Sequence, residues 1–104
     1  MKAYRIDPAA KAITEIDLPN AQEGLAEIGA QKDIGFDEID DNGDRLYFDE
    51  ACFINEKPGA GRFQLDRLPP VSGIGIIAGW DLSADKLDSV KVTHETLVSR
   101  VKFL

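Results

Sequence analysis

The residues with the clearest chemical potential are the acids between positions 33 and 50. This segment carries eight carboxylates and one base, Arg45, so its net charge of −7 equals that of the whole chain. Such a surface attracts a basic protein surface, even one that normally binds nucleic acid, and the attraction speeds association. The alternative is a charged surface that only keeps strand edges from aggregating. The candidate interaction surface comprises Asp37, Glu38, Asp40, Asp41, Asp44, Asp49 and Glu50, and Asp33 is the eighth acid.

Part of this segment approximates the oxygen spacing of a calcium-binding loop. The matching residues are Glu38, Asp40, Asn42, Gly43, Asp44 and Asp49, at loop positions 1, 3, 5, 6, 7 and 12. The match is poor, because Glu stands at position 1, Asp replaces the longer bidentate Glu at position 12, and no flanking helices are evident. We therefore predict a solvated hairpin tip and not a metal site.

Four other chemistries have weak sequence signals. The segment Gly73–Ala78 matches a dinucleotide-binding fingerprint, but it follows Pro69-Pro70 and its glycines alternate with isoleucines that favour a strand. Cys52 and His94 are the obvious candidates for a nucleophile and a base, yet we expect Cys52 inside a strand and His94 on an exposed helical turn. Structural zinc usually needs four Cys or His ligands, and abundant carboxylates alone do not make an acid–base pair. We predict no catalytic residue, cofactor-binding residue, metal ligand or cofactor.

The second functional hypothesis is a small-ligand-binding domain or an enzyme with an unrecognised site. Residues 1–56 carry 14 acids and 5 bases, whereas residues 57–104 carry 5 acids and 7 bases. In this second half, Arg62, Arg67 and Trp80 are the candidate ligand contacts. Ordinary surface charges and a packing aromatic residue explain the same three side chains.

The first elements that position these residues are a hairpin and a helix. Strands over Lys2–Ile6 and Ala12–Leu18, joined by a loop over Asp7–Lys11, form the predicted hairpin. Asn20 and Glu23 have the spacing of a capping box, which predicts a short helix over residues 21–29.

The acidic segment itself predicts a second hairpin from Phe36 to Phe48. Its centre is Asn42-Gly43, a dipeptide suited to a tight turn. This register places Ile39 opposite Leu46 and Asp40 opposite Arg45, but it sets Asp41 against Asp44. The like charges leave a slightly longer loop as the alternative.

The rest of the chain predicts further strands and a terminal helix. Ala51–Ile54 continues or restarts a strand, Phe63–Leu65 is a short strand, and Val71–Trp80 is a strand buried on both faces near the sheet centre. Ser83–Ser89 is a loop or one helical turn. Thr93 is predicted to cap a helix beginning at His94, with Val92 and Leu97 as a hydrophobic staple, and Val101–Phe103 either continues the helix or forms a strand.

Length and composition predict one folded α+β domain over residues 1–104, mainly an antiparallel sheet of about five or six strands with two short helices. The net charge of −7 disfavours direct nucleic-acid binding. A single cysteine, no signal peptide and no apolar stretch long enough for a membrane span lead us to expect a cytoplasmic protein without membrane contact. The expected partner is an unknown protein, and a homodimer is an alternative because open sheets leave strand edges.

Several segments together also carry a family resemblance. They are Lys2–Pro8, Ile13–Ile16, Gly43–Glu50, Pro70–Gly79 and Arg100–Leu104. The chain resembles, over nearly its whole length, a family of small uncharacterised bacterial and phage proteins, a domain of unknown function found on mobile elements. This resemblance implies a fold and a cytoplasmic setting, and it implies no activity or functional residue.

Overall fold

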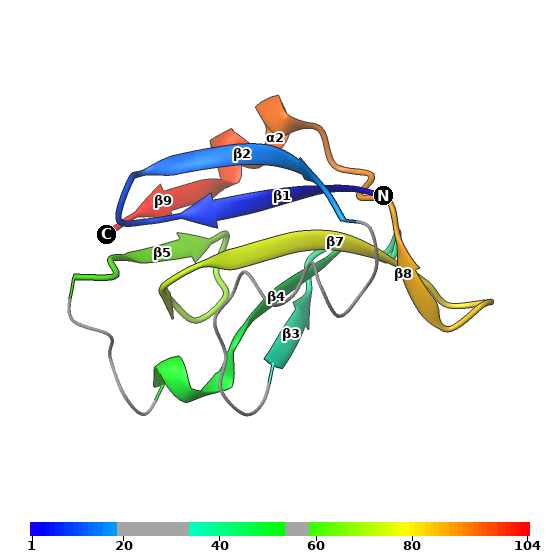
Figure 1. Cartoon of the computed structure of the whole chain (residues 1–104), viewed down its shortest axis with the longest axis horizontal. Helices are drawn as coiled ribbons and strands as arrows, with labels where there is room; N and C mark the ends of the chain where they lie inside the picture. The colour runs from blue at the N-terminus through cyan, green and yellow to red at the C-terminus, as the bar shows by residue number, and fades with distance from the viewer. Residues whose placement is uncertain (19–33, 54–58) are drawn as a thin grey trace.

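The computed structural model describes residues 1–18, 34–53 and 59–104 (Figure 1). In these ranges the chain forms nine strands, one α-helix and one 3-10 helix. None of the helices described there is long and apolar enough to span a membrane. The elements are β1 (Lys2–Asp7), β2 (Ala12–Asp17), β3 (Ile34–Glu38), β4 (Arg45–Asp49), η2 (Glu50–Phe53), β5 (Arg62–Leu65), β6 (Val71–Ser72), β7 (Gly75–Asp81), β8 (Lys86–Asp88), α2 (His94–Arg100) and β9 (Val101–Phe103).

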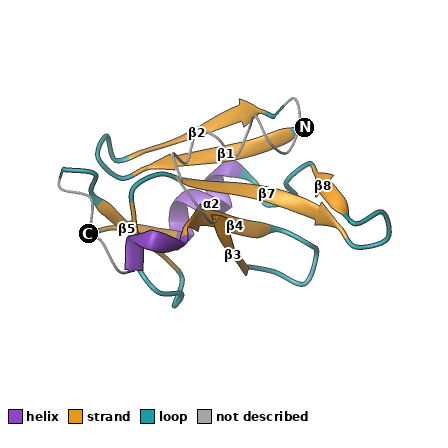
Figure 2. Ribbon diagram, turned by 60° about the horizontal axis from the view of Figure 1, so that its bottom comes forward, coloured by secondary structure: helices purple, strands orange, loops and turns teal. Residues whose placement is uncertain are grey.

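The strands form two antiparallel sheets. The larger sheet has six strands in the order β2-β1-β7-β4-β3, with β8 paired to the far end of β7, and the smaller sheet has the order β6-β5-β9 (Figures 1 and 2). The expected mainly antiparallel α+β arrangement is confirmed. The expected sheet of about five or six strands is matched in part, because the larger sheet has six strands but the chain also builds a second sheet of three. Of the two expected helices, the terminal one is present, and the one over residues 21–29 lies outside the described residues.

The first hairpin is confirmed. β1 and β2 pair from Lys2 with Asp17 to Asp7 with Ala12. The Asp7 carboxylate accepts hydrogen bonds from the backbone N–H groups of Ala9 and Ala10, at 3.1 and 3.3 Å. A short polar side chain thus satisfies the turn, as the composition of this loop predicts.

The apolar segment from Val71 to Trp80 is divided between the two sheets. β6 pairs with β5, whereas β7 lies between β1 and β4 at the centre of the larger sheet. The break is at Gly73, whose φ of 90° suits glycine and whose N–H donates to the Gly61 carbonyl at 3.1 Å. The predicted central, doubly covered strand is confirmed for β7, where Ile76 and Ile77 are both fully buried on opposite faces. A single continuous strand is wrong.

The predicted strand over Ala51–Ile54 is also wrong. Residues Glu50–Phe53, including Cys52, form the 3-10 helix η2, and Ile54 lies outside the described residues. The turn begins where the Asp49 carboxylate accepts the N–H of Ala51 at 2.9 Å, which diverts the chain from the β4 ladder.

The polar segment Ser83–Ser89 contains a strand that its composition does not suggest. β8 pairs antiparallel with the end of β7, from Gly79 with Asp88 to Asp81 with Lys86. Asp81 accepts the N–H groups of Ser83 and Ala84, which closes this hairpin. Both predicted alternatives, a loop and a helical turn, are therefore wrong for Lys86–Asp88.

The terminal helix is confirmed. Thr93 Oγ1 accepts the Thr96 N–H at 3.2 Å, and α2 begins at His94. Val92 and Leu97 are buried in the same hydrophobic cluster, as a staple requires. After Arg100 the chain forms β9, which pairs with β5, so the strand alternative for Val101–Phe103 is adopted.

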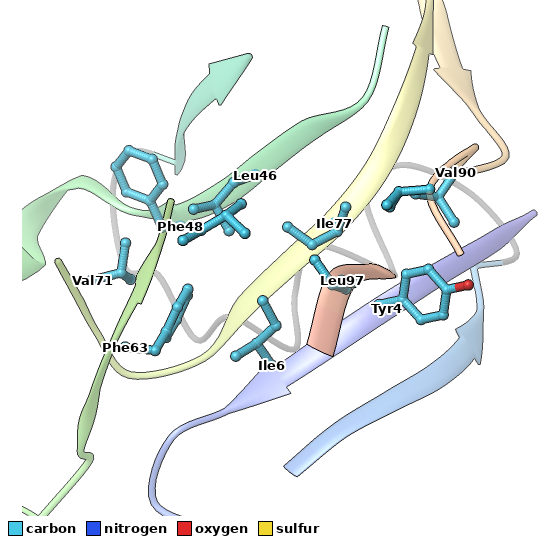
Figure 3. Packing of buried hydrophobic residues seen from close by; sticks show 11 residues of the cluster. Tyr4, Ile6, Leu46, Phe48, Phe63, Val71, Ile77, Val90 and Leu97 are labelled. Atoms are coloured by element: carbon cyan, nitrogen blue, oxygen red, sulfur yellow. The ribbon is translucent and has the colours of Figure 1, made fainter. Parts of the chain in front are cut away.

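The main core lies between one face of the larger sheet and the elements that cover it. Figure 3 shows Ile6, Ile77 and Leu46 from the larger sheet near Leu97 from α2 and Phe63 from β5. A second cluster, which includes Ala3, Tyr47 and Ile76, lies on the opposite face. The edge that carries β3 and the start of β4 holds the acidic segment.

Candidate functional site

The loop between β3 and β4 is longer than a two-residue turn. Glu38 lies opposite Arg45 and Asp37 lies opposite Leu46, so the tight register is wrong and the longer loop is adopted. The Asn42 side chain accepts the Asp44 N–H at 3.0 Å. Gly43 has a φ of 98°, and a Cβ there would lie 2.4 Å from the Trp80 carbonyl oxygen, so only glycine fits against β7.

Asp44 is not part of any surface. Its carboxylate is fully buried and accepts the backbone N–H groups of Lys91 and Val92, at 2.9 and 2.8 Å. These bonds fasten the hairpin to the segment that leads into α2. The prediction of Asp44 as an interaction residue is wrong, because a carboxylate with two long-range backbone donors has a structural role.

Asp49 is corrected in the same way. It is buried, and its carboxylate accepts the N–H of Ala51 at the start of η2. Asp44 and Asp49 are two of the carboxylates that approximate the spacing of a calcium-binding loop, and both are buried. Across residues 1–18, 34–53 and 59–104, no group of three or more His, Cys, Asp or Glu side chains could hold a metal ion.

Asp40 belongs to an ion cluster around Arg100. The Arg100 Nη1 donates to Asp40 Oδ2 at 2.9 Å, its Nη2 donates to Asp66 Oδ2 at 2.5 Å, and Nη2 also donates to the Ile39 carbonyl at 3.2 Å. These carboxylates, Asp66 first and Asp40 second, raise the pKa of Arg100 further above its already high value. The cluster connects the β3–β4 loop, the turn after β5 and the end of α2.

The other four predicted residues remain accessible. Glu38 is 69% exposed, with its Oε1 3.9 Å from Arg45 Nη2. Asp41 and Glu50 are exposed, and Asp37 is half-buried. Among the described residues, the acidic surface is therefore smaller than the sequence suggests and consists of Asp37, Glu38, Asp41 and Glu50, and Asp33 lies outside those residues.

An aromatic stack that sequence reasoning missed lies beside these acids. The Arg45 guanidinium lies 4.1 Å from the ring centroid of Phe36 and 4.6 Å from that of Trp80, and the Arg45 side chain is only 12% exposed. Such cation–π contacts hold the guanidinium over the sheet. The sequence does contain a signal for this stack, since Phe36 and Arg45 lie on two strands that pair. The signal can be recognised only when the register of the two strands is known. The one base of the segment is thus largely covered.

A groove lies next to the Arg100 cluster. It has a volume of about 360 Å³ and is lined by Glu38, Ile39, Asp66, Arg67 and Leu68. Of the three candidate ligand contacts, Arg62, Arg67 and Trp80, Arg67 is the one that lines this groove. Trp80 stacks on Arg45 and Arg62 belongs to the β5 ladder, so the contacts seen in the described chain do not assemble Arg62, Arg67 and Trp80 into one site.

The remaining candidate residues have structural positions. His94 is exposed at the first position of α2, as predicted, and its Nε2 lies 2.8 Å from the Ile13 carbonyl, which ties the helix to β2. Gly73–Ala78 runs from a turn into the central strand β7 and does not open a helix, so it lacks the context of a dinucleotide-binding loop.

In comparisons with known proteins, no protein-family model, no curated protein and no solved structure matches the chain.

Proposed function

We propose that this chain is a non-enzymatic interaction protein that docks on a basic protein surface through the exposed acids of the β3–β4 hairpin and η2. The observation that carries the proposal is the charge of this edge. Glu38, Asp41 and Glu50 are exposed and Asp37 is half-buried, while the base Arg45 is covered by two aromatic rings. Complementary charge speeds encounter and selects the partner. The resemblance noted above adds a cytoplasmic setting and a phage or mobile-element origin to the proposal.

Four substitutions test this function without touching the buried carboxylates. They are Asp37→Asn, Glu38→Gln, Asp41→Asn and Glu50→Gln. The matched control removes the same number of negative charges from exposed acids elsewhere, by Glu15→Gln, Asp17→Asn, Asp85→Asn and Glu95→Gln. The two variants have equal net charge and differ in where the charge is lost.

The measurement is affinity capture from a lysate of the host cell, quantified at about 50 mM and about 500 mM salt, where screening lengths differ severalfold. We expect the wild type and the control variant to capture the same protein at low salt. The hairpin variant should not retain this protein, and high salt should release it from the wild type. If both variants retain the same proteins as the wild type, or if no captured protein responds to salt, the proposed function is wrong.

A second candidate function is small-ligand binding, favoured by the groove of about 360 Å³ beside Arg67. This volume lies at the lower end of the range of ligand pockets. A thermal-shift screen of metabolites checks it, because a bound ligand raises the melting temperature by mass action. A ligand that fails to shift an Arg67→Ala variant would place binding in this groove, whereas no shift with any compound would count against this function.

A further inference from the structure

The strand β3 is the outermost strand of the larger sheet among the described residues, and its one strand partner there is β4 (Figure 1). The Ile39 N–H donates to the Asp44 carbonyl at 3.1 Å, which identifies this pair as a hydrogen-bonded one. Because such pairs alternate along an antiparallel ladder, Asp37 and Gly35 also turn their backbone groups toward β4. The backbone groups of Ile34, Phe36 and Glu38 therefore point away from the sheet.

The side chains of these three residues are also exposed. Ile34 is 37% exposed, Phe36 is 47% exposed and Glu38 is more exposed still. A strand edge that combines outward backbone groups with exposed apolar side chains is a template for an added strand. The covered guanidinium of Arg45 supports the Phe36 ring from the sheet side.

Charge decides which strand this edge accepts. Residues 34–50 carry seven acids and one base, so a second copy of this chain would bring two strongly negative hairpins together. An extended segment that alternates Lys or Arg with apolar residues would instead place its apolar side chains on the face of Phe36. Its cations would lie on the opposite face, near Asp37 and near Glu50, whose side chain lies over Gly35.

We propose that the basic partner docks at this edge as an extended segment, adding a strand to β3 through the backbone groups of Ile34, Phe36 and Glu38. This inference rests on the proposed function and specifies how the partner is held. Main-chain hydrogen bonds then supply affinity, and the alternation of basic and apolar side chains supplies specificity.

The probe is a short, end-blocked peptide of alternating lysine and valine, and its controls are a glutamate–valine peptide and a lysine–valine peptide with a central proline. We expect the first peptide to bind in a salt-dependent manner and the two controls to bind at least about tenfold more weakly. Amide hydrogen exchange of the full chain then locates the peptide. Exchange at Phe36 and Glu38 slows in the complex, whereas Gly35 and Asp37 are already protected by the β4 ladder.

The substitution Phe36→Pro removes one outward N–H, which edge strands tolerate, and Phe36→Leu keeps it. We expect Phe36→Pro to weaken peptide binding about fivefold or more, the effect of about one lost hydrogen bond, and Phe36→Leu to weaken it less. Retained protection of Gly35 and Asp37 in free Phe36→Pro verifies that the ladder is intact. If that ladder is lost, the exchange pattern of the wild-type complex decides alone.

Two results separate this inference from the function on which it rests. In the first, the peptide binds in a salt-dependent manner and the four hairpin substitutions abolish binding, but exchange at Phe36 and Glu38 does not slow. This result overturns strand addition and supports the acidic docking surface. Absence of binding to the lysine–valine peptide overturns strand addition, and the lysate capture then judges the proposed function independently.

Discussion

At the scale of single residues, neighbouring carboxylates of the same type have unrelated roles. Asp44 accepts two backbone N–H groups inside the protein, Asp40 pairs with Arg100, and Asp41 faces solvent. These residues lie within five positions of one another, so position along the chain does not predict the role. The role is set by which donors the fold brings to each carboxylate.

Asp44→Asn is expected to lower the free energy of unfolding by about 1–3 kcal/mol, because an amide leaves one of the two N–H groups of Lys91 and Val92 without an acceptor. Urea denaturation measures the loss. The matched control, Asp41→Asn, removes an exposed carboxylate from the same loop and changes stability by less than about 0.5 kcal/mol. Equal effects of the two substitutions would contradict the structural role of Asp44.

Tyr47 provides a pH-dependent prediction. Burial raises the pKa of its phenol above 10.0, and nearby Arg45 offsets part of the increase. Its hydroxyl has no hydrogen-bond partner among the described residues. As the pH rises above 10, the unfolded chain releases this proton while the folded chain retains it, so the folded state binds more protons and stability falls.

Tyr47→Phe should therefore change stability by less than about 1 kcal/mol at pH 7, since no hydrogen bond is lost. Above pH 10 it should make the decline in stability shallower than in the wild type. Urea denaturation at pH 8, 10 and 11 measures both effects. Parallel declines in the two proteins would show that the phenol does not contribute.

At the scale of elements, the start of α2 is set by residues close to it in the sequence, whereas the register of the β3–β4 hairpin is set by residues far away in the sequence. The start of α2 depends on Thr93 and on a staple between residues five positions apart. The β3–β4 register depends on contacts with β7 and with residues 91 and 92, because Gly43 packs on Trp80 and Asp44 binds beyond the sheet.

Thr93→Ala removes the acceptor for the Thr96 N–H and is expected to destabilise the protein by about 1 kcal/mol. Thr93→Ser keeps a hydroxyl in place and serves as the matched control, with a much smaller effect. Thermal unfolding followed by circular dichroism compares the two variants. A Thr93→Ser variant as unstable as Thr93→Ala would indicate that the methyl group, and not the cap, matters.

At the scale of the whole molecule, the charge is unevenly distributed and the fold concentrates part of it at one edge of the larger sheet. Like charges gathered at one edge repel one another in the folded state, so an acidic edge of this kind lowers stability. A binding role would explain why the acidic edge is retained despite this cost, because binding surfaces are commonly not optimised for stability.

The four hairpin substitutions should therefore raise the free energy of unfolding by about 0.5 kcal/mol at low salt, and the gain should shrink as salt screens the repulsion. The control set should give no gain, because it removes the ion pairs of Glu15 with Lys2 at 3.3 Å and of Asp17 with the N-terminal ammonium group at 2.7 Å, whereas the Glu38–Arg45 pair that the hairpin set removes is longer, at 3.9 Å. Urea denaturation at two salt concentrations tests this. A gain that is independent of salt would rule out charge repulsion as its cause.

The amino-acid sequence by itself determined the elements whose causes are local: the first hairpin with its Asp7 turn, the cap at Thr93, and the apolar strand β7 that is covered on both faces. Only the tertiary structure decided the break at Gly73, the strand β8 and the division of the acids into buried, paired and exposed groups. The reason is physical. Turns and caps are satisfied by donors and acceptors a few residues away, whereas the partners of Asp44 and Asp40 lie in segments that only packing brings close.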